Sequence, residues 1–170
     1  TSLQVECNKK FAYSADETLK IIQSLYEKKV ATYPRVDTTY LSDDIYPKCP
    51  GILKGLRDYE TFTAPLTGTA LLKSKKVFDN SKVTDHHALI VTENLPGKLE
   101  TDEQAIYELI AGRMLEAFSE KCVKDVTSVT LECAGSLFTV KGSIIKSAGW
   151  RAVFGEKDDG EDNATLPAMQ

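Results

Sequence analysis

Several familiar sequence features are missing from this chain of 170 residues. No apolar run is long enough to cross a membrane, and the beginning lacks the basic-then-apolar pattern of a secretory signal. The G-x-x-x-x-G-K-[ST] phosphate loop, the G-x-G-x-x-G motif and the H-E-x-x-H motif are also absent. We therefore expect no membrane partner and no ATP binding by a familiar route, and we predict no metal site in the chain itself.

Cysteine is sparse and shows no C-x-x-C pairing. A chain of this size buries a sizeable core without disulfides, and metal-ligand spacing is absent. Two disulfides are the alternative, but we expect free, mostly buried thiols in a reducing cytoplasm. The chain begins with Thr1 rather than Met, which suggests a piece of a longer protein. The four cysteines are Cys7, Cys49, Cys122 and Cys133.

The acidic charge is unevenly distributed. The formal net charge is −4, which argues weakly against a nucleic-acid partner. Residues 1–90, however, carry thirteen basic and eleven acidic side chains, whereas residues 156–170 carry one basic and five acidic. A basic surface in the first half therefore remains compatible with the composition. The lysine cluster at 73–76 is interpreted as a solvated loop, with a DNA-backbone contact as the alternative.

Helix signals dominate the first 121 residues. Ser14-Ala15-Asp16-Glu17 and Thr101-Asp102-Glu103-Gln104 both have the pattern of a capping box. Apolar residues at helical spacing follow each of them. We predict helices over residues 1–10, from 14 to 29, from 41 onward and from 101 through 118, with 61–86 as a loop. Pro47 and Pro50 should make the first part of the segment from 41 onward irregular.

The pattern changes near residue 122. Residues 126–133 and 137–145 alternate and are rich in Val, Thr and Ile, and Ala134-Gly135 separates them, as in a β-hairpin. Residues 149–154 and 166–168 are predicted as further strands, with an acidic loop at 155–163. The fold class is therefore α+β and mainly helical, with a boundary between 1–121 and 122–170.

The most informative segment is ATYPRVDTTY, residues 31–40. Pro34 disfavours the helical conformation at Tyr33 and favours an extended one. Alternate side chains of an extended segment point the same way, so we expect Tyr33, Arg35 and Asp37 to share one side. A phenol can act as a nucleophile, and a guanidinium can hold a phosphate by paired hydrogen bonds. This set suggests covalent chemistry on a phosphodiester.

A tyrosine needs help to act as a nucleophile, because a phenol with a pKa of about 10 is protonated at pH 7. The chain has two histidines, His86 and His87. One of them near Tyr33 could donate to a phosphate or assist proton transfer. Adjacent histidines share no helical face, so the pair does not favour a metal site. The alternatives are a Tyr33 that merely packs at a helix exit and histidines that bond the backbone.

Three segments together resemble type IA DNA topoisomerases. Residues 31–38 are similar to the active-site motif usually written Thr-Tyr-Pro-Arg-Thr-Asp-Ser, with Val36 in place of Thr and Thr38 in place of Ser. Residues 14–26 resemble the helix leading into that motif. The run KVTDHHALI, residues 82–90, resembles the His-containing motif in the form typical of bacterial topoisomerase III. The resemblance spans the whole chain.

The resemblance implies a specific role for each of the motif residues. Tyr33 would be the nucleophile that becomes linked to a 5′ phosphate of single-stranded DNA. Arg35 and His86 would act with it at the scissile phosphate. The positions implied to bind DNA or shape the site are Arg35, Asp37, Thr38 and His87.

The resemblance also implies what lies outside the chain. Residues 1–121 would be the helical central domain, and 122–170 would supply strands of the arch domain. A separate Toprim domain, to which nothing here is similar, would bind Mg²⁺, so no cofactor is expected in this piece and the piece alone should not relax DNA. We expect a bacterial, cytoplasmic and nucleoid-associated protein. The rival interpretations are a non-catalytic helical DNA-binding module and a tyrosine recombinase, whose dispersed Arg/His set is not evident.

Overall fold

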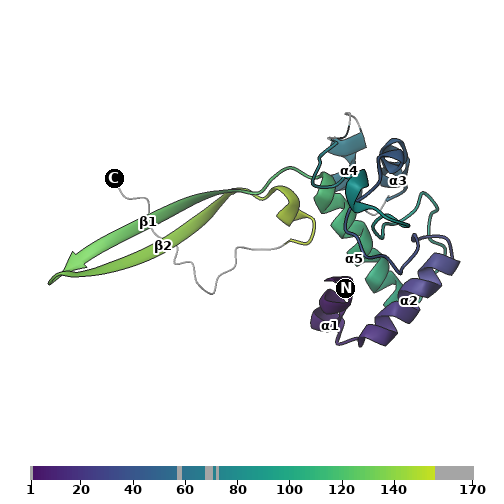
Figure 1. The fold of residues 1–170 in the computed structure, drawn as a ribbon, viewed down its shortest axis with the longest axis horizontal. Coiled ribbons are helices and arrows are strands. Elements are labelled where there is room, and N and C mark those ends of the chain that lie inside the picture. The colour runs from purple at the N-terminus through teal and green to yellow at the C-terminus, as the bar shows by residue number, and fades with distance from the viewer. Residues whose placement is uncertain (1, 57–58, 68–70, 72, 156–170) are drawn as a thin grey trace. The chain divides into compact units, whose positions relative to one another are not determined.

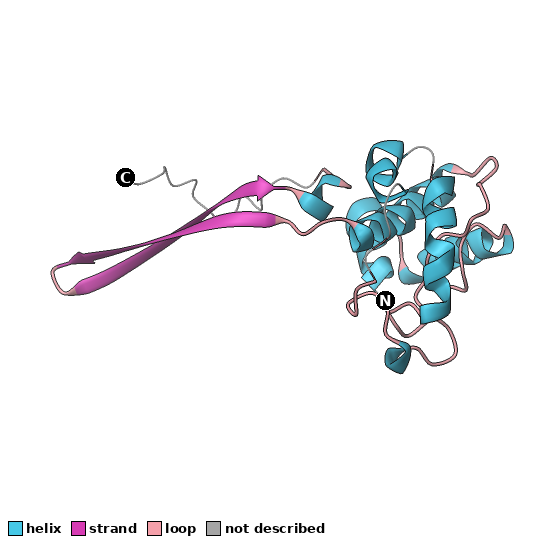
Figure 2. Cartoon of the chain, turned by 90° about the horizontal axis from the view of Figure 1, so that it is seen from above, coloured by secondary structure: helices cyan, strands magenta, loops and turns pink. Residues whose placement is uncertain are grey.

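Helices build the first part of the chain and a β-hairpin builds the second (Figures 1 and 2). The computed structural model describes residues 2–56, 59–67, 71 and 73–155, and it divides into the units Thr1–Phe118 and Ser119–Gln170. The first unit contains α1 (Ser2–Phe11), α2 (Ala15–Glu27), α3 (Cys49–Gly55), α4 (Glu60–Thr67) and α5 (Thr101–Phe118), with 3₁₀ turns at Asp43–Lys48 and Asn80–Lys82. The second unit contains β1 (Val123–Cys133), β2 (Ser136–Ser147) and a 3₁₀ turn at Gly149–Ala152. The mainly helical α+β class is confirmed.

Helix α5 forms the centre of the first unit, where it contacts α2 and α4. Its side chains are buried at consecutive positions, so several of its faces are covered, as expected of a core helix. None of the described helices is both long and apolar enough to cross a membrane. The buried apolar side chains of α5 include Ile106, Tyr107, Leu109, Ile110, Met114, Leu115 and Phe118.

The predicted capping box at the start of α2 is confirmed. The backbone N–H of Glu17 donates to Ser14 Oγ (3.2 Å), and the backbone N–H of Ser14 donates to Glu17 Oε2 (2.8 Å). These bonds satisfy two donors that the first turn of a helix leaves unpaired. They also lower the pKa of Glu17. The start of α2 is therefore fixed by local chemistry.

The predicted capping box at Thr101 is wrong by one residue. The backbone N–H of Glu100 donates to Glu103 Oε2 (2.9 Å), so the reciprocal acceptor is Glu103 rather than the expected Gln104. Glu103 is buried and also accepts hydrogen bonds from Ser24 Oγ and Lys28 Nζ, each at 2.6 Å. The contact with α2 thus orients this carboxylate toward the start of α5.

One further prediction in the helical unit is corrected. Residues 61–86 are not all loop, because they contain most of α4 and the 3₁₀ turn Asn80–Lys82. Helix α4 packs against α3 and α5 and buries Thr63, so tertiary contacts outweigh the weak local preference. The irregular start expected in the segment from residue 41 onward is confirmed, because a 3₁₀ turn precedes the α-helix. Pro47 lies inside that turn, and α3 begins at Cys49.

The β-hairpin is confirmed, with both strands longer than predicted. The strands are antiparallel and Cys133 pairs with Ser136, which leaves the expected two-residue turn. Both turn residues have positive φ, +49° at Ala134 and +76° at Gly135, the combination found in tight hairpin turns. Leu131 pairs with Phe138, and these apolar side chains are 59% and 58% exposed.

The predicted third strand at 149–154 is wrong. Gly149 has a φ of +52° and begins a 3₁₀ turn. A Cβ there would lie 2.5 Å from the carbonyl oxygen of Glu120, and the backbone N–H of Trp150 donates to that oxygen (2.9 Å). The close return of the chain to Glu120 therefore replaces the expected strand. The acidic loop at 155–163, beyond its first residue, and the strand at 166–168 lie outside the described residues.

The four cysteines are free, as predicted, but only two are fully buried. Cys7 and Cys49 lie in the core, Cys122 is partly exposed and Cys133 is exposed. Burial raises the pKa of Cys7, and it raises that of Cys49 to about 11. Both core thiols are therefore protonated and act as small apolar groups.

Candidate active site

Short backbone pairing brings the tyrosine segment beside the histidine segment. Ala31 forms an antiparallel bridge with Val91. The backbone N–H of Thr32 donates to Ile90 O (2.9 Å), and that of Ile90 donates to Thr32 Oγ1 (3.0 Å). Tyr33 follows directly. The pairing therefore joins positions about 58 residues apart in the sequence and sets where Tyr33 emerges.

A second set of bonds holds the far end of the tyrosine segment. The backbone N–H of Ala88 donates to Tyr40 O (2.8 Å). Leu41 forms a parallel bridge with Phe78, and its N–H donates to Val77 O (2.8 Å). Residues 31–41 are thus attached at both ends to residues 77–91, with the motif residues between the attachments.

The ring of Tyr33 contacts two other rings. Its centroid is 4.5 Å from that of His86 and 5.6 Å from that of Tyr26, which meets it edge-on at 79°. Tyr33 is partly buried, whereas His86 and Tyr26 are exposed. The structure therefore brings together the predicted nucleophile and the predicted histidine, and it adds Tyr26 from α2 as a support for the phenol.

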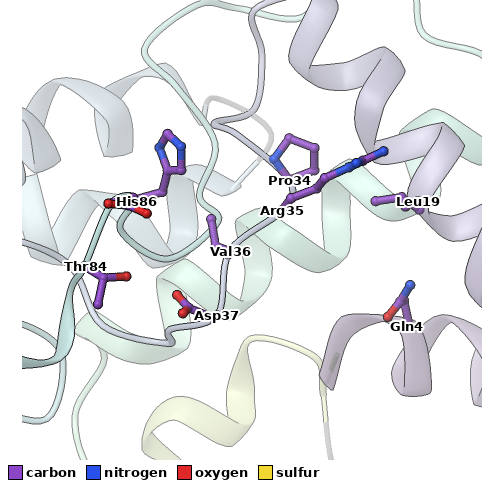
Figure 3. A pocket seen from close by; sticks show the side chains of 9 residues that line it. Gln4, Leu19, Pro34, Arg35, Val36, Asp37, Thr84 and His86 are labelled. Atoms are coloured by element: carbon purple, nitrogen blue, oxygen red, sulfur yellow. The ribbon is translucent and has the colours of Figure 1, made fainter.

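Arg35, Asp37 and His86 line a cavity of about 440 Å³ (Figure 3). Arg35 is exposed, and its side chain extends toward Leu19 of α2. The imidazole of His86 lies on the other side of Pro34 in this view. Arg35 and His86 thus share a cavity, but the guanidinium and the imidazole extend in different directions.

The predicted alternation of side chains along this segment is not observed. Pro34 and Val36 line the same cavity as Arg35 and Asp37, whereas Tyr33 does not line it. Backbone pairing ends at Thr32, and the chain then bends at residues 34, 37 and 39. Without a continuous strand, the two-residue period of side-chain direction is lost.

A second cavity, of about 480 Å³, lies on the His87 side. His86 lines both cavities, as do Thr84 and Asp85. His87 Nδ1 lies 2.7 Å from the carbonyl oxygen of Ala88, so this nitrogen is engaged by the backbone. A hydrogen bond with Ser42 lowers the pKa of Asp44 here. The other lining residues are Asn80 and Val83.

Thr38 has a local role in the described structure. Its Oγ1 accepts a hydrogen bond from the backbone N–H of Tyr40 (3.1 Å), which shapes the turn after Asp37. Asp37 is exposed and lines the Arg35 cavity. The two residues therefore border the site in different ways, one through the backbone and one through its carboxylate.

The comparisons with known proteins agree on one family. The family model described as DNA topoisomerase matches residues 1–170. DNA topoisomerase 3 of Bacillus subtilis (strain 168) is 38% identical over 180 residues, which cover 100% of this chain and 25% of the relative. The chain belongs to the type IA DNA topoisomerases. DNA topoisomerase 3 of Bacillus licheniformis is also 38% identical, over 99% of this chain and 24% of its own length. This topoisomerase chain thus spans about a quarter of these relatives.

A solved structure supports the fold. Full-length topoisomerase I from Thermotoga maritima matches with a TM-score of 0.65 at 22% identity, covering 99% of this chain and 28% of that one. The predicted resemblance to the type IA topoisomerases, and to topoisomerase III among them, is confirmed by the relatives and the family model.

The sequence did not reveal several neighbours of the topoisomerase motif residues. Thr32 and Tyr26 were not expected to position Tyr33, and Gln4 and Thr84 were not expected to line a cavity. The only signal was that Thr32, Tyr26 and Thr84 belong to segments that resemble the family. Within the part of the chain that the structure describes, no group of three or more His, Cys, Asp or Glu could hold a metal ion.

Proposed function

We propose that this chain is the tyrosine-bearing part of an enzyme that transiently cleaves and religates single-stranded DNA. The Tyr33 hydroxyl gives up its proton as Oη attacks a backbone phosphorus and forms a bond to the 5′ phosphate. The bond from phosphorus to the 3′ oxygen breaks, and that oxygen leaves as a 3′ hydroxyl after taking up a proton. The reverse attack by this hydroxyl reseals the strand. No ATP is consumed, because the phosphotyrosine retains the energy of the original bond.

The observation that carries this proposal is the contact between Tyr33 and His86. An imidazole with its centroid 4.5 Å from the phenol ring can exchange protons near the reacting oxygens or donate to the phosphate. Tyr33 is also positioned by the pairing of the neighbouring Thr32 with Ile90 and by its contact with the ring of Tyr26. Such preorganisation lowers the cost of placing a nucleophile against its target.

The remaining motif residues fit contacts to DNA around Tyr33. Arg35 is exposed, and no ion pair with it is found among the described residues, so its guanidinium is available for the paired hydrogen bonds that a phosphate accepts. Asp37 lines the same cavity, and His87 lines the next one. Thr38 acts by shaping the turn that follows Asp37. We assign these four residues to DNA binding and to the shape of the site.

The proposal includes partners from the rest of a longer protein. A Toprim domain would supply Mg²⁺, and no group of ligands for it is found in the described residues, so we assign no magnesium step to this chain. The hairpin β1–β2 would belong to the arch domain. The exposed apolar pair Leu131 and Phe138 supports this, because further chain would cover such side chains. The piece alone would be inactive.

The test uses the full-length protein with Mg²⁺ and a single-stranded oligonucleotide labelled at either end. A label at the 3′ end should move with the protein on a denaturing gel, and a label at the 5′ end should not. Tyr33→Phe should abolish the adduct. Tyr13→Phe, which removes a phenol at the junction of α1 and α2, is the matched control and should retain it. A non-catalytic DNA-binding module predicts no adduct with any variant, including the unmodified protein.

A further inference from the structure

A second tyrosine, Tyr40, makes a side-chain contact between residues 31–41, which contain Tyr33, and residues 77–91, which contain His86. Lys82 Nζ donates a hydrogen bond to Tyr40 Oη (2.9 Å) and lies 4.2 Å from the centroid of the Tyr40 ring. Tyr33 and Tyr40 both belong to residues 31–41, and His86 and Lys82 both belong to residues 77–91. Like Tyr33 and His86, Tyr40 and Lys82 therefore form a contact with one residue in each of the two segments.

The backbone on both sides of this pair is anchored. Tyr40 O accepts from the N–H of Ala88 (2.8 Å), and the Tyr40 N–H donates to Thr38 Oγ1 (3.1 Å). The N–H of Lys82 donates to Asp79 O (3.0 Å) at the end of the turn Asn80–Lys82. Anchored backbone on each side limits the conformations open to both side chains. The pair is thus held in place before any ligand arrives.

Lys82 keeps hydrogen-bonding capacity for a ligand. Its side chain is 52% exposed, and its contact with Asp79 Oδ2, at 3.8 Å, is too long for a hydrogen bond. Asp79 itself accepts hydrogen bonds from Ser81, at 3.1 Å from the backbone N–H and 2.6 Å from Oγ. The hydrogen bond with Tyr40 raises the pKa of Lys82, so the ammonium group stays charged.

The chemistry of the pair selects an anion with several acceptor oxygens. An ammonium group has three N–H donors, and one of them points to Tyr40. Since Tyr40 Oη accepts that bond, its own O–H remains free to donate. Two adjacent donors, one charged and one neutral, match two oxygens of a phosphate diester.

We propose that Lys82 and Tyr40 bind a backbone phosphate of the DNA single strand, other than the phosphate attacked by Tyr33. This deepens the proposed function and rests on it for the identity of the strand. The pairs Tyr33–His86 and Tyr40–Lys82 would thus contact the DNA strand at two different points. Lys82 supplies the charge, and Tyr40 positions it and adds a neutral hydrogen bond.

The test measures binding rather than cleavage, with the full-length protein carrying Tyr33→Phe as the parent. Fluorescence anisotropy with a labelled single strand across a salt series gives the slope of log K against log salt. Each phosphate contact to a single strand contributes about 0.7 to that slope. Lys82→Gln should therefore reduce its magnitude by about 0.7, which weakens binding about fivefold at 0.1 M salt.

Three further variants make the result specific. Lys82→Arg keeps the charge and should retain the parent slope. Tyr40→Phe should weaken binding without changing the slope. Lys20→Gln, which removes an exposed lysine paired with Asp16 on α2 (2.7 Å), is the matched control and should also retain the parent slope.

The phosphate contact of Lys82 and Tyr40 can fail or hold independently of the cleavage chemistry proposed for Tyr33. Absence of an adduct with Tyr33 present would refute the cleavage chemistry and leave this contact intact, because the binding parent cannot cleave. A slope for Lys82→Gln equal to that of Lys20→Gln would overturn the phosphate contact, whether or not the enzyme cleaves DNA.

Discussion

The ring of Tyr33 lies 4.5 Å from the imidazole of His86, measured between centroids. The two residues come from segments far apart in the sequence, and the pairing of Ala31 with Val91 brings those segments together. The contact places a potential proton carrier beside a potential nucleophile. We expect this contact to depend on the backbone that supports it.

Replacing His86 by Phe separates the chemistry of the imidazole from its packing. The variant keeps an aromatic ring against Tyr33 but removes both nitrogens. If the imidazole transfers a proton or binds the phosphate, the rate of adduct formation should fall about 100-fold. Single-turnover cleavage of a labelled oligonucleotide measures this rate. A rate within twofold of the parent would mean that the ring only packs.

Thr32 should position Tyr33 through its side chain. Thr32→Val keeps the shape of the residue but removes the acceptor for the Ile90 N–H (3.0 Å). We expect cleavage to slow about tenfold, because displacement of a nucleophile by a fraction of an ångström is costly. Thr32→Ser keeps the hydroxyl and should restore most of the rate. Equal rates for the two variants would count against this role.

The contact between α2 and α5 should make stability depend on acidic pH. Hydrogen bonds from Lys28, Ser24 and the Glu100 backbone lower the pKa of Glu103 from 4.5 to about 2. Because the folded-state pKa is depressed, this stabilisation is present above pH 4.5 and is lost as the pH falls toward about 2.

The variant Glu103→Gln isolates that contribution. It should cost about 1–3 kcal/mol in the free energy of unfolding at pH 7, because several donors lose a charged acceptor. The difference from the parent should shrink between pH 4.5 and about 2. Unfolding followed by circular dichroism across this range checks the prediction. A difference that stays constant with pH would show that the carboxylate charge does not stabilise the fold.

The hairpin turn contains a strained residue. Ala134 has a φ of +49°, a conformation that costs a residue with a Cβ about 1 kcal/mol. Ala134→Gly should therefore stabilise β1 and β2 and slow hydrogen exchange of their amides. Ala148→Gly, at a φ of −66°, is the control and should not stabilise the hairpin. Faster exchange in Ala134→Gly would contradict the strain.

Local chemistry explains the elements that could be predicted from the sequence. The capping box Ser14–Glu17 depends on two side chains three residues apart, and the hairpin depends on alternation around Ala134-Gly135. Both signals lie within a few residues. The closeness of Tyr33 and His86 could also be predicted, because both residues lie in sequence motifs that resemble one active site of the family.

The features that were missed depend on contacts between distant segments. A strand was expected at 149–154, but the bond from Trp150 to Glu120 and the positive φ of Gly149 produce a turn. The box expected at Thr101 shifted because Lys28 and Ser24 engage Glu103. The bond from Lys82 to Tyr40 joins residues 42 apart, and no periodicity in the sequence predicts it.

The most direct test of the account is to locate the covalent bond to DNA. The full-length protein is incubated with a single-stranded oligonucleotide, the adduct is denatured and digested with protease and nuclease, and the modified peptide is sequenced by mass spectrometry. The account predicts a nucleotide joined through its 5′ phosphate to Tyr33. A nucleotide on Tyr26 or Tyr40 instead, or an adduct that persists in Tyr33→Phe, would contradict it.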